Sequence, residues 1–246
     1  MRAALIYILV FLSVITACHK AYYAQSYSSR HYAVGKNDMQ DSSYIRFLQP
    51  YKTRMDSTMQ IVIGRADTTL TKAQPECTLG NFVADAMLQA ARQVNPKVCA
   101  AVCNYGGLRV PYLQAGSITI GKMYELMPFD NALTIIEVPG TILVQWCRHM
   151  AAAKGWPVSG ISYIINEGNT VDIQINHRAI DEKATYLIAT NDYLATGGDK
   201  CNFLIPLKAT PCNMFIRDVL IDYVKGLSNI NKPLHPYIEN RVRYAE

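Results

Sequence analysis

The order of apolar and polar positions predicts helices that alternate with strands in the first half of the chain. The clearest helix runs from about Leu79 to Val94, where apolar residues recur at the three- and four-residue spacing of a helix face. The other predicted helices are 43–55, 120–127, 140–152 and 215–225. The first of these is expected to break near Pro50, because proline removes a backbone hydrogen bond from a helix interior.

Short apolar segments without helical spacing predict buried strands. The predicted strands are 60–64, 97–102, 133–138, 162–165, 171–175 and 186–190. Strands that first alternate with helices and then follow one another are typical of an α/β fold with a mixed sheet. We therefore expect a single α/β domain with layered helices and mixed β-sheets, without an internal repeat.

The N-terminus has the pattern of an export signal. Arg2 precedes an apolar run over residues 3–16, which is about the length of a signal-peptide core and too short for a membrane span. The run leads into Thr16-Ala17-Cys18, which resembles the sequence that the bacterial lipoprotein signal peptidase cuts before a lipid-modified cysteine. A buried helix that ends in a cysteine is the alternative interpretation.

This pattern predicts three segments and a location. Residues 1–17 are expected to be a lipoprotein signal peptide, residues 18–42 a polar, tyrosine-rich tether, and residues 43–246 the folded domain. Lipidation of Cys18 would anchor the protein to a membrane of the cell envelope, on the periplasmic side or at the cell surface.

Composition narrows the possible functions. Half of the residues are hydrophobic and 17% are charged, which is typical of a globular domain. The net charge of +5 is dispersed along the chain, so a nucleic-acid groove, which needs clustered Lys and Arg, is not expected. Beyond Cys18 there are six cysteines and no CxxC pair, so no metal site is predicted, and disulfide pairing stays open.

Three loops at the ends of predicted elements present polar or aromatic residues, and two of these loops contain paired glycines. Asn104-Tyr105-Gly106-Gly107-Leu108-Arg109 follows a strand, and its glycines allow a ligand to approach the backbone. The second loop presents Phe129 after a proline, and the third, residues 191–199, presents Tyr193 before two glycines and a carboxylate. Two aromatic side chains of this kind can enclose a flat heterocycle. Taken singly, each loop is compatible with a plain turn or a core aromatic.

Consecutive segments of the chain resemble the signature motifs of the C-terminal domain of the 5′-nucleotidase family. The matching segments are Glu76-Cys77-Thr78-Leu79-Gly80-Asn81, NYGGLR from Asn104, MPFDNAL from Met127, VSGIS from Val158 and NDYLATGGD from Asn191. The resemblance extends from about Ile45 to Ile205 and implies the fold of that domain.

The resemblance also implies a nucleotide site. By motif position, Phe129 and Tyr193 would stack on the two faces of the base, and Tyr193 stands where the family often has phenylalanine. Asn104 and Arg109 fall on residues that bind ribose or phosphate groups.

Three further positions carry implied contacts. Asn131 would lie near the base, Gly160 would contact the base through its backbone, and Asp199 would accept hydrogen bonds from the ribose hydroxyls. A substrate-binding arginine that the family often has before the first motif is missing here, so that its phosphate contact is either lost or supplied by Lys72.

The chain departs from the family in a larger respect. Members carry an N-terminal metallophosphatase domain with D-x-H, GNH[DE] and G-H-x-H motifs, and none of the five histidines of this sequence lies in such a motif. No cofactor or metal is therefore expected on this chain, and divalent metals are expected on a partner phosphatase.

One function is the leading hypothesis, and a second stays open as its alternative. The first is the nucleotide-recognition part of a 5′-nucleotidase-type hydrolase that acts with a separate metallophosphatase subunit. The second is a lipoprotein that binds a nucleotide or nucleoside without hydrolysing it. A structural lipoprotein that has lost the site is a third interpretation, and the presence of all three loops argues against it.

Overall fold

The computed structural model describes residues 26, 28–33, 35 and 41–246, and the chain divides into two units, residues 1–47 and 48–246. Within the first unit, the Asp41 carboxylate accepts hydrogen bonds from the backbone N–H and the hydroxyl of Ser43, at 2.8 and 2.6 Å. These bonds lower the pKa of Asp41. The predicted signal peptide and Cys18 lie outside the described residues.

Five helices follow the sequence prediction, with one correction in the first of them, and a short sixth helix lies in the segment 191–199 that was predicted as a loop. In the described part of the chain they are α2 (Ser42–Met59), α3 (Thr78–Val94), α4 (Ile120–Leu126), α5 (Gly140–Ala152), α6 (Asp192–Ala195) and α7 (Ile216–Asn229), with 3₁₀ turns η1 (Tyr105–Gly107), η2 (Gly198–Lys200) and η3 (Asn202–Leu204). The predicted break near Pro50 is wrong, because α2 runs through it. This helix buries no residue, so water can hydrate the carbonyl that the proline leaves without a donor.

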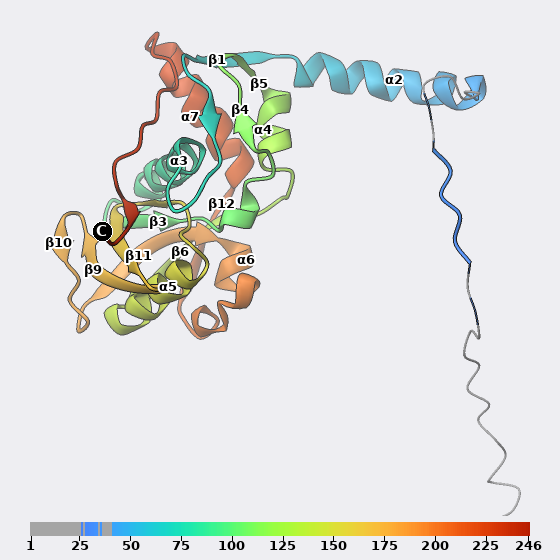
Figure 1. Ribbon diagram of the computed structural model, residues 1–246. Helices are drawn as coiled ribbons and strands as arrows, with labels where there is room; N and C mark the ends of the chain where they lie inside the picture. Colours follow the sequence, from blue (N-terminus) through green and yellow to red (C-terminus); the bar gives the residue numbers. More distant parts are fainter. Residues whose placement is uncertain (1–25, 27, 34, 36–40) are drawn as a thin grey trace, which may run out of the picture. The chain divides into compact units, whose positions relative to one another are not determined.

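Most strands belong to two mixed sheets (Figure 1). The central sheet has the order β12 (Ala209–Phe215), β6 (Ala132–Pro139), β11 (Thr185–Asn191), β3 (Ala100–Val102) and β7 (Val158–Ser159). The second has the order β10 (Arg178–Ala179), β9 (Asn169–Ile175), β8 (Ile161–Asn166) and β13 (Val242–Tyr244). Two small pairs join β1 (Val62–Ala66) to β5 (Gly116–Thr119) and β2 (Leu70–Thr71) to β4 (Tyr112–Leu113).

The central sheet has a hydrophobic core on each face. Along β3, Ala101 and Cys103 point into the core beneath α3 and α7, while Ala100 and Val102 point into the core beneath α5 and the second sheet. This alternation follows from the two-residue period of a strand. Figure 1 shows α3 and α7 on one side of the sheet and α5 on the other. The prediction of a layered α/β domain with mixed sheets is confirmed.

The six cysteines of the described region are free thiols. Complete burial raises the pKa of Cys103 and of Cys147 to about 12, which keeps both thiols protonated at neutral pH. Cys77 is the N-cap of α3: its sulfur accepts a hydrogen bond from the backbone N–H of Gly80 at 3.2 Å.

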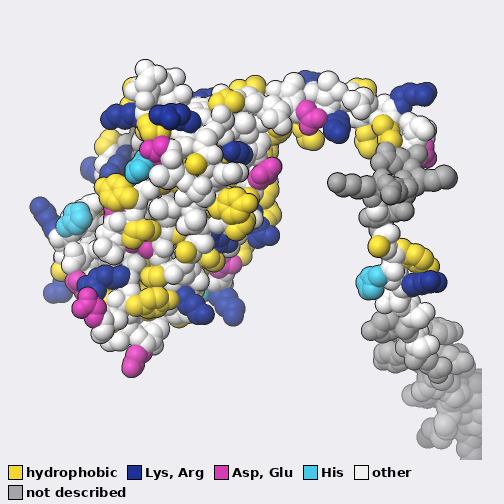
Figure 2. Space-filling view, turned by 45° about the horizontal axis from the view of Figure 1, so that its top comes forward, with side chains coloured by type: hydrophobic (Ala, Val, Ile, Leu, Met, Phe, Trp, Pro, Cys, Tyr) yellow, Lys and Arg dark blue, Asp and Glu magenta, His cyan; other side chains and the backbone are white. Residues whose placement is uncertain are grey.

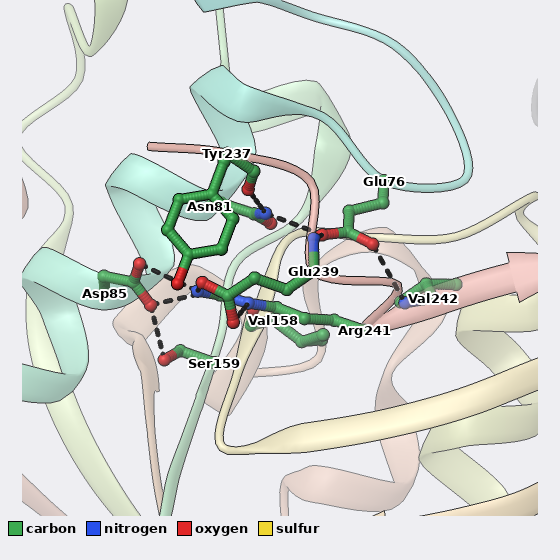
Figure 3. Close-up of polar contacts among 9 residues, drawn as sticks. All are labelled: Glu76, Asn81, Asp85, Val158, Ser159, Tyr237, Glu239, Arg241 and Val242. Carbon is green, nitrogen blue, oxygen red and sulfur yellow. Dashed lines mark hydrogen bonds and ion pairs between the residues drawn. The ribbon is translucent and has the colours of Figure 1, made fainter. Parts of the chain in front are cut away.

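The C-terminal segment is attached to α3 by a polar network (Figure 3). Arg241, which is 9% exposed, donates two hydrogen bonds to the Asp85 carboxylate at 2.7 and 2.9 Å and one to the Val158 carbonyl at 2.9 Å. Ser159 donates to the same carboxylate at 2.6 Å. Burial alone would lower the pKa of Arg241, but the hydrogen bonds and charges of Asp85 and Glu239 outweigh it and raise that pKa.

Asp85→Ala should therefore destabilise the fold. The substitution removes the two-bond partner of the buried Arg241 and leaves it only the partly exposed Glu239 carboxylate. The loss should cost about 2–4 kcal/mol of unfolding free energy, between a lost charge-assisted hydrogen bond and a broken buried ion pair. Asp222→Ala, on the exposed side of α7, is the matched control and should change stability by less than about 0.5 kcal/mol. Urea titrations measure both, and equal stability of the two variants would contradict a structural role for the ion pair.

Candidate functional site

The three predicted loops surround one pocket of about 300 Å³. Its lining residues are Asn104, Gly106, Gly107, Arg109, Phe129, Asn131, Tyr193 and Asp199. Every substrate-binding residue predicted from the sequence is in this set except Gly160. Residues that are up to 95 positions apart in the chain, such as Asn104 and Asp199, are thus brought together.

Strand order explains why these loops meet. β11 pairs with β3 in parallel and with β6 in antiparallel orientation. The carboxyl ends of β3 and β11 and the amino end of β6 therefore share one edge of the sheet. The loops that carry Asn104, Tyr193 and Asn131 adjoin those three strand ends, at the edge where open α/β sheets commonly bind ligands.

Buried amides connect the first loop to the third. Asn191, which is fully buried, caps α6 by accepting a hydrogen bond from the Leu194 backbone at 2.8 Å, and it donates to the Asn104 side-chain oxygen at 3.0 Å. Asn104 in turn donates to an Asp199 carboxylate oxygen at 2.7 Å. Because each amide is oriented at both its oxygen and its nitrogen, the position of the Asp199 carboxylate is set from the sheet edge.

The third loop folds back on its own aromatic residue. The Tyr193 hydroxyl donates to the second oxygen of Asp199 at 2.9 Å and accepts from the Asp199 backbone N–H at 3.1 Å. Gly198 lies against the ring, since a Cβ there would approach it to 2.5 Å. Asp199 has a φ of 48°, and its backbone carbonyl lies 2.9 Å from Nε2 of His149. The sequence analysis did not identify His149, which contacts the backbone of the third loop, or Asn191, which orients Asp199 through Asn104.

The second loop is held by an arginine that the sequence analysis also missed. Arg217 of α7 donates to the Asp130 carboxylate at 2.8 Å and to the Pro128 carbonyl at 3.4 Å, and its guanidinium lies 4.0 Å from the centre of the Tyr124 ring. The Arg217 side chain is only 9% exposed. The signal in the sequence is an arginine beside Ile216 on the apolar face of a predicted helix.

Arg109 is the cation of the pocket. Its guanidinium lies 5.3 Å from the centre of the Phe129 ring, within the range of a cation–π contact, and its side chain is exposed. Lys72 does not line the pocket: its ammonium donates to the Leu108 carbonyl at 2.7 Å and lies 4.2 Å from the centre of the Tyr105 ring. Burial, followed by the charge of Arg109, lowers the pKa of Lys72.

The two pocket aromatics are not core residues. Phe129 is 49% exposed and Tyr193 is 43% exposed, whereas Phe82 in the core is 1% exposed. Each ring is therefore available to a ligand in the pocket, and the interpretation of either as a core filler is excluded.

The predicted base contact of Gly160 does not fit this pocket. Gly160 lines a different hollow, with Asn176, His177 and Arg241 among its neighbours. A Cβ at Gly160, where φ is 74°, would come within 2.2 Å of the Cys99 carbonyl. The close approach of two backbones explains the glycine here without a ligand.

The described residues offer no sign of a metal site or of a membrane-spanning helix. They contain no group of three or more His, Cys, Asp or Glu side chains placed to hold a metal ion. Among them no helix combines the length and the apolar character that crossing a membrane requires. On the face drawn in Figure 2, Lys and Arg side chains are separated by acidic and uncharged ones and form no continuous basic stripe.

Comparison with known proteins agrees with this architecture. The family model described as the 5′-nucleotidase C-terminal domain matches residues 62–205, more than half of the chain. The chain is 29% identical to the trifunctional nucleotide phosphoesterase YfkN of Bacillus subtilis over 80% of this chain and 15% of that protein. It is 25% identical to the protein 5NUC of Lutzomyia longipalpis over 85% of this chain and 42% of that protein.

A solved structure of a 5′-nucleotidase has the same fold over most of this chain. The 5′-nucleotidase precursor from Thermus thermophilus superposes with a TM-score of 0.73 and 25% identity, over 84% of this chain and 44% of that one. This chain therefore belongs to the 5′-nucleotidase C-terminal domain family, whose members act with an N-terminal metallophosphatase domain. It spans less than half the length of the curated relatives that it matches.

Proposed function

We propose that this chain is the nucleotide-recognition part of a 5′-nucleotidase-type phosphoester hydrolase, and that a separate metallophosphatase polypeptide supplies the divalent metals and the cleavage step. The observation that carries the proposal is the pocket itself, which collects two exposed aromatic rings, a carboxylate, an arginine and two amides from three loops. Relatives named as 5′-nucleotidases and nucleotide phosphoesterases support the same substrate class.

Each pocket residue has chemistry that suits one part of a nucleotide. The Phe129 and Tyr193 rings offer π-faces to a base, and the Asn131 amide can both donate to and accept from its edge. The Asp199 carboxylate accepts hydrogen bonds, as a ribose diol requires, and the Arg109 guanidinium suits a phosphate oxygen.

The donor set of the described residues does not suit a two-metal centre. His235 is bonded to Asp67 at 2.7 Å, and His149 lies against a backbone carbonyl. Neither belongs to a cluster of three potential ligands. We therefore assign no metal to this chain, and the alternative function is nucleotide binding without hydrolysis.

Phe129→Ala and Tyr193→Ala should each weaken nucleoside binding by about 1–3 kcal/mol, the size of one lost base–aromatic stack. Both variants should stay folded, because the rings are exposed; a core aromatic would instead cost about 3–5 kcal/mol of stability. Calorimetric titration with adenosine and uridine, together with thermal melts, separates the two effects. Tyr112→Ala, exposed and outside the pocket, is the control. Folded pocket variants with unchanged affinity would rule out a base-binding site between the Phe129 and Tyr193 rings.

The purified soluble domain alone should not release phosphate from AMP in the presence of Mn²⁺ or Zn²⁺. Mixing it with the cognate metallophosphatase should produce turnover that EDTA abolishes and that Phe129→Ala reduces. EDTA-sensitive turnover by the pure chain would contradict the assignment of the metals to a partner. Nucleoside binding without turnover in the mixture would support the non-hydrolytic alternative.

The proposal includes a lipid anchor at the cell envelope. It rests on the apolar run that ends at Cys18, outside the described residues. Labelled fatty acid should be incorporated into the wild-type protein and not into Cys18→Ser, and the mature wild-type chain should begin at Cys18. Label that persists in Cys18→Ser, or a mature chain that begins at another residue, would show that the anchor is misassigned.

A further inference from the structure

The Asp199 carboxylate is unusually well fixed for a surface group. Its two oxygens accept from the Tyr193 hydroxyl at 2.9 Å and from the Asn104 amide at 2.7 Å, although Asp199 is exposed. Its backbone N–H donates to the same hydroxyl at 3.1 Å, and its backbone carbonyl faces His149. The positive φ of 48° lies in the left-handed region, which residues other than glycine adopt less readily, so these contacts hold a conformation that the loop alone would not favour.

The two contacts leave the carboxylate with the acceptor capacity that a vicinal diol needs. An ionised carboxylate has about four lone-pair sites, two on each oxygen. Tyr193 and Asn104 each occupy one site on a different oxygen, so one site remains on each. A ribose ring presents two neighbouring hydroxyl donors, which match two acceptors held side by side.

The same tyrosine also supplies a wall of the base slot. Gly198 lies against its ring, and the Tyr193 backbone N–H donates to Asp192 at 2.9 Å, so the ring and the carboxylate form one rigid unit. A phenylalanine would present the same ring face without the hydroxyl. The ring of Tyr193 would stack on the base, while its hydroxyl orients the Asp199 carboxylate for the ribose. The hydroxyl can be removed without the ring.

We propose that the Tyr193 hydroxyl is a positioning group that fixes the Asp199 carboxylate for the ribose diol, and that it makes the pocket discriminate ribonucleosides from 2′- and 3′-deoxynucleosides. This inference rests on the proposed nucleotide-binding function. It assigns to the hydroxyl a role in selectivity that a hydrogen bond serving only loop stability would not have.

The experiment compares wild type with Tyr193→Phe by calorimetric titration against adenosine, 2′-deoxyadenosine, 3′-deoxyadenosine and adenine, with the uridine series in parallel. Tyr193→Phe should bind adenosine about five-fold more weakly, the effect of losing one ordering hydrogen bond, and should bind adenine as wild type does. The ratio of adenosine to deoxyadenosine affinity should fall accordingly. In an Asp199→Asn background the Tyr193→Phe effect on this ratio should disappear.

Tyr186→Phe is the matched control, because its hydroxyl accepts a hydrogen bond from the Asp181 backbone at 2.8 Å outside the pocket. It should leave all ratios unchanged. Equal weakening of adenosine, the deoxynucleosides and adenine by Tyr193→Phe, or no weakening, overturns the role of the hydroxyl while leaving nucleoside binding intact. Failure of the wild-type protein to bind any of these probes instead overturns the proposed function, and this inference with it.

Discussion

β11 is hydrogen-bonded to β3 in parallel on one side and to β6 in antiparallel orientation on the other, and the site depends on this arrangement. It decides which strand ends share an edge of the sheet, and so which loops can meet. β11 is buried against both cores, with Ile188 facing one and Ala189 the other. A one-residue shift in its register would exchange those two side chains and misplace the loops, so the packing of the core also fixes the geometry of the pocket.

Two asparagine side chains connect the end of β11 to the pocket, and each donates one hydrogen bond and accepts another. Asn191 sits at the end of β11 with no exposed surface, where an unsatisfied amide would cost about 1–3 kcal/mol. Its oxygen caps α6 and its nitrogen orients Asn104, which orients Asp199. The carboxylate is therefore preorganised by a chain of two amides, and rigid support of this kind lowers the entropy that ligand binding must lose.

The sequence predicts the five longer helices, six of the strands and the pocket loops, because periodicity, proline and paired glycines are local signals. It does not predict β12, because Pro211 and mostly exposed residues do not give the apolar pattern of a strand. This edge strand forms by pairing with β6. Arg217 and the Arg241–Asp85 pair were also missed, since each joins segments far apart in the chain. At Gly160 the fold adds a constraint that the motif does not reveal, the close approach to the Cys99 carbonyl, while its contact with the base stays a prediction.

The pocket is open on the side where Phe129, Tyr193 and Arg109 are exposed, and this bears on how a two-chain enzyme would work. The proposed base and ribose contacts in this pocket would contribute to catalysis only if they held the phosphate at the metals of another polypeptide. In a single chain the second half is present at high effective concentration, whereas two separate chains must associate first. Confinement of both halves to one membrane, with Cys18 as the proposed anchor of this half, would restrict the search between them and partly restore that advantage. A lipid anchor at Cys18 and metals on a second polypeptide, both as proposed, would then be two parts of one arrangement.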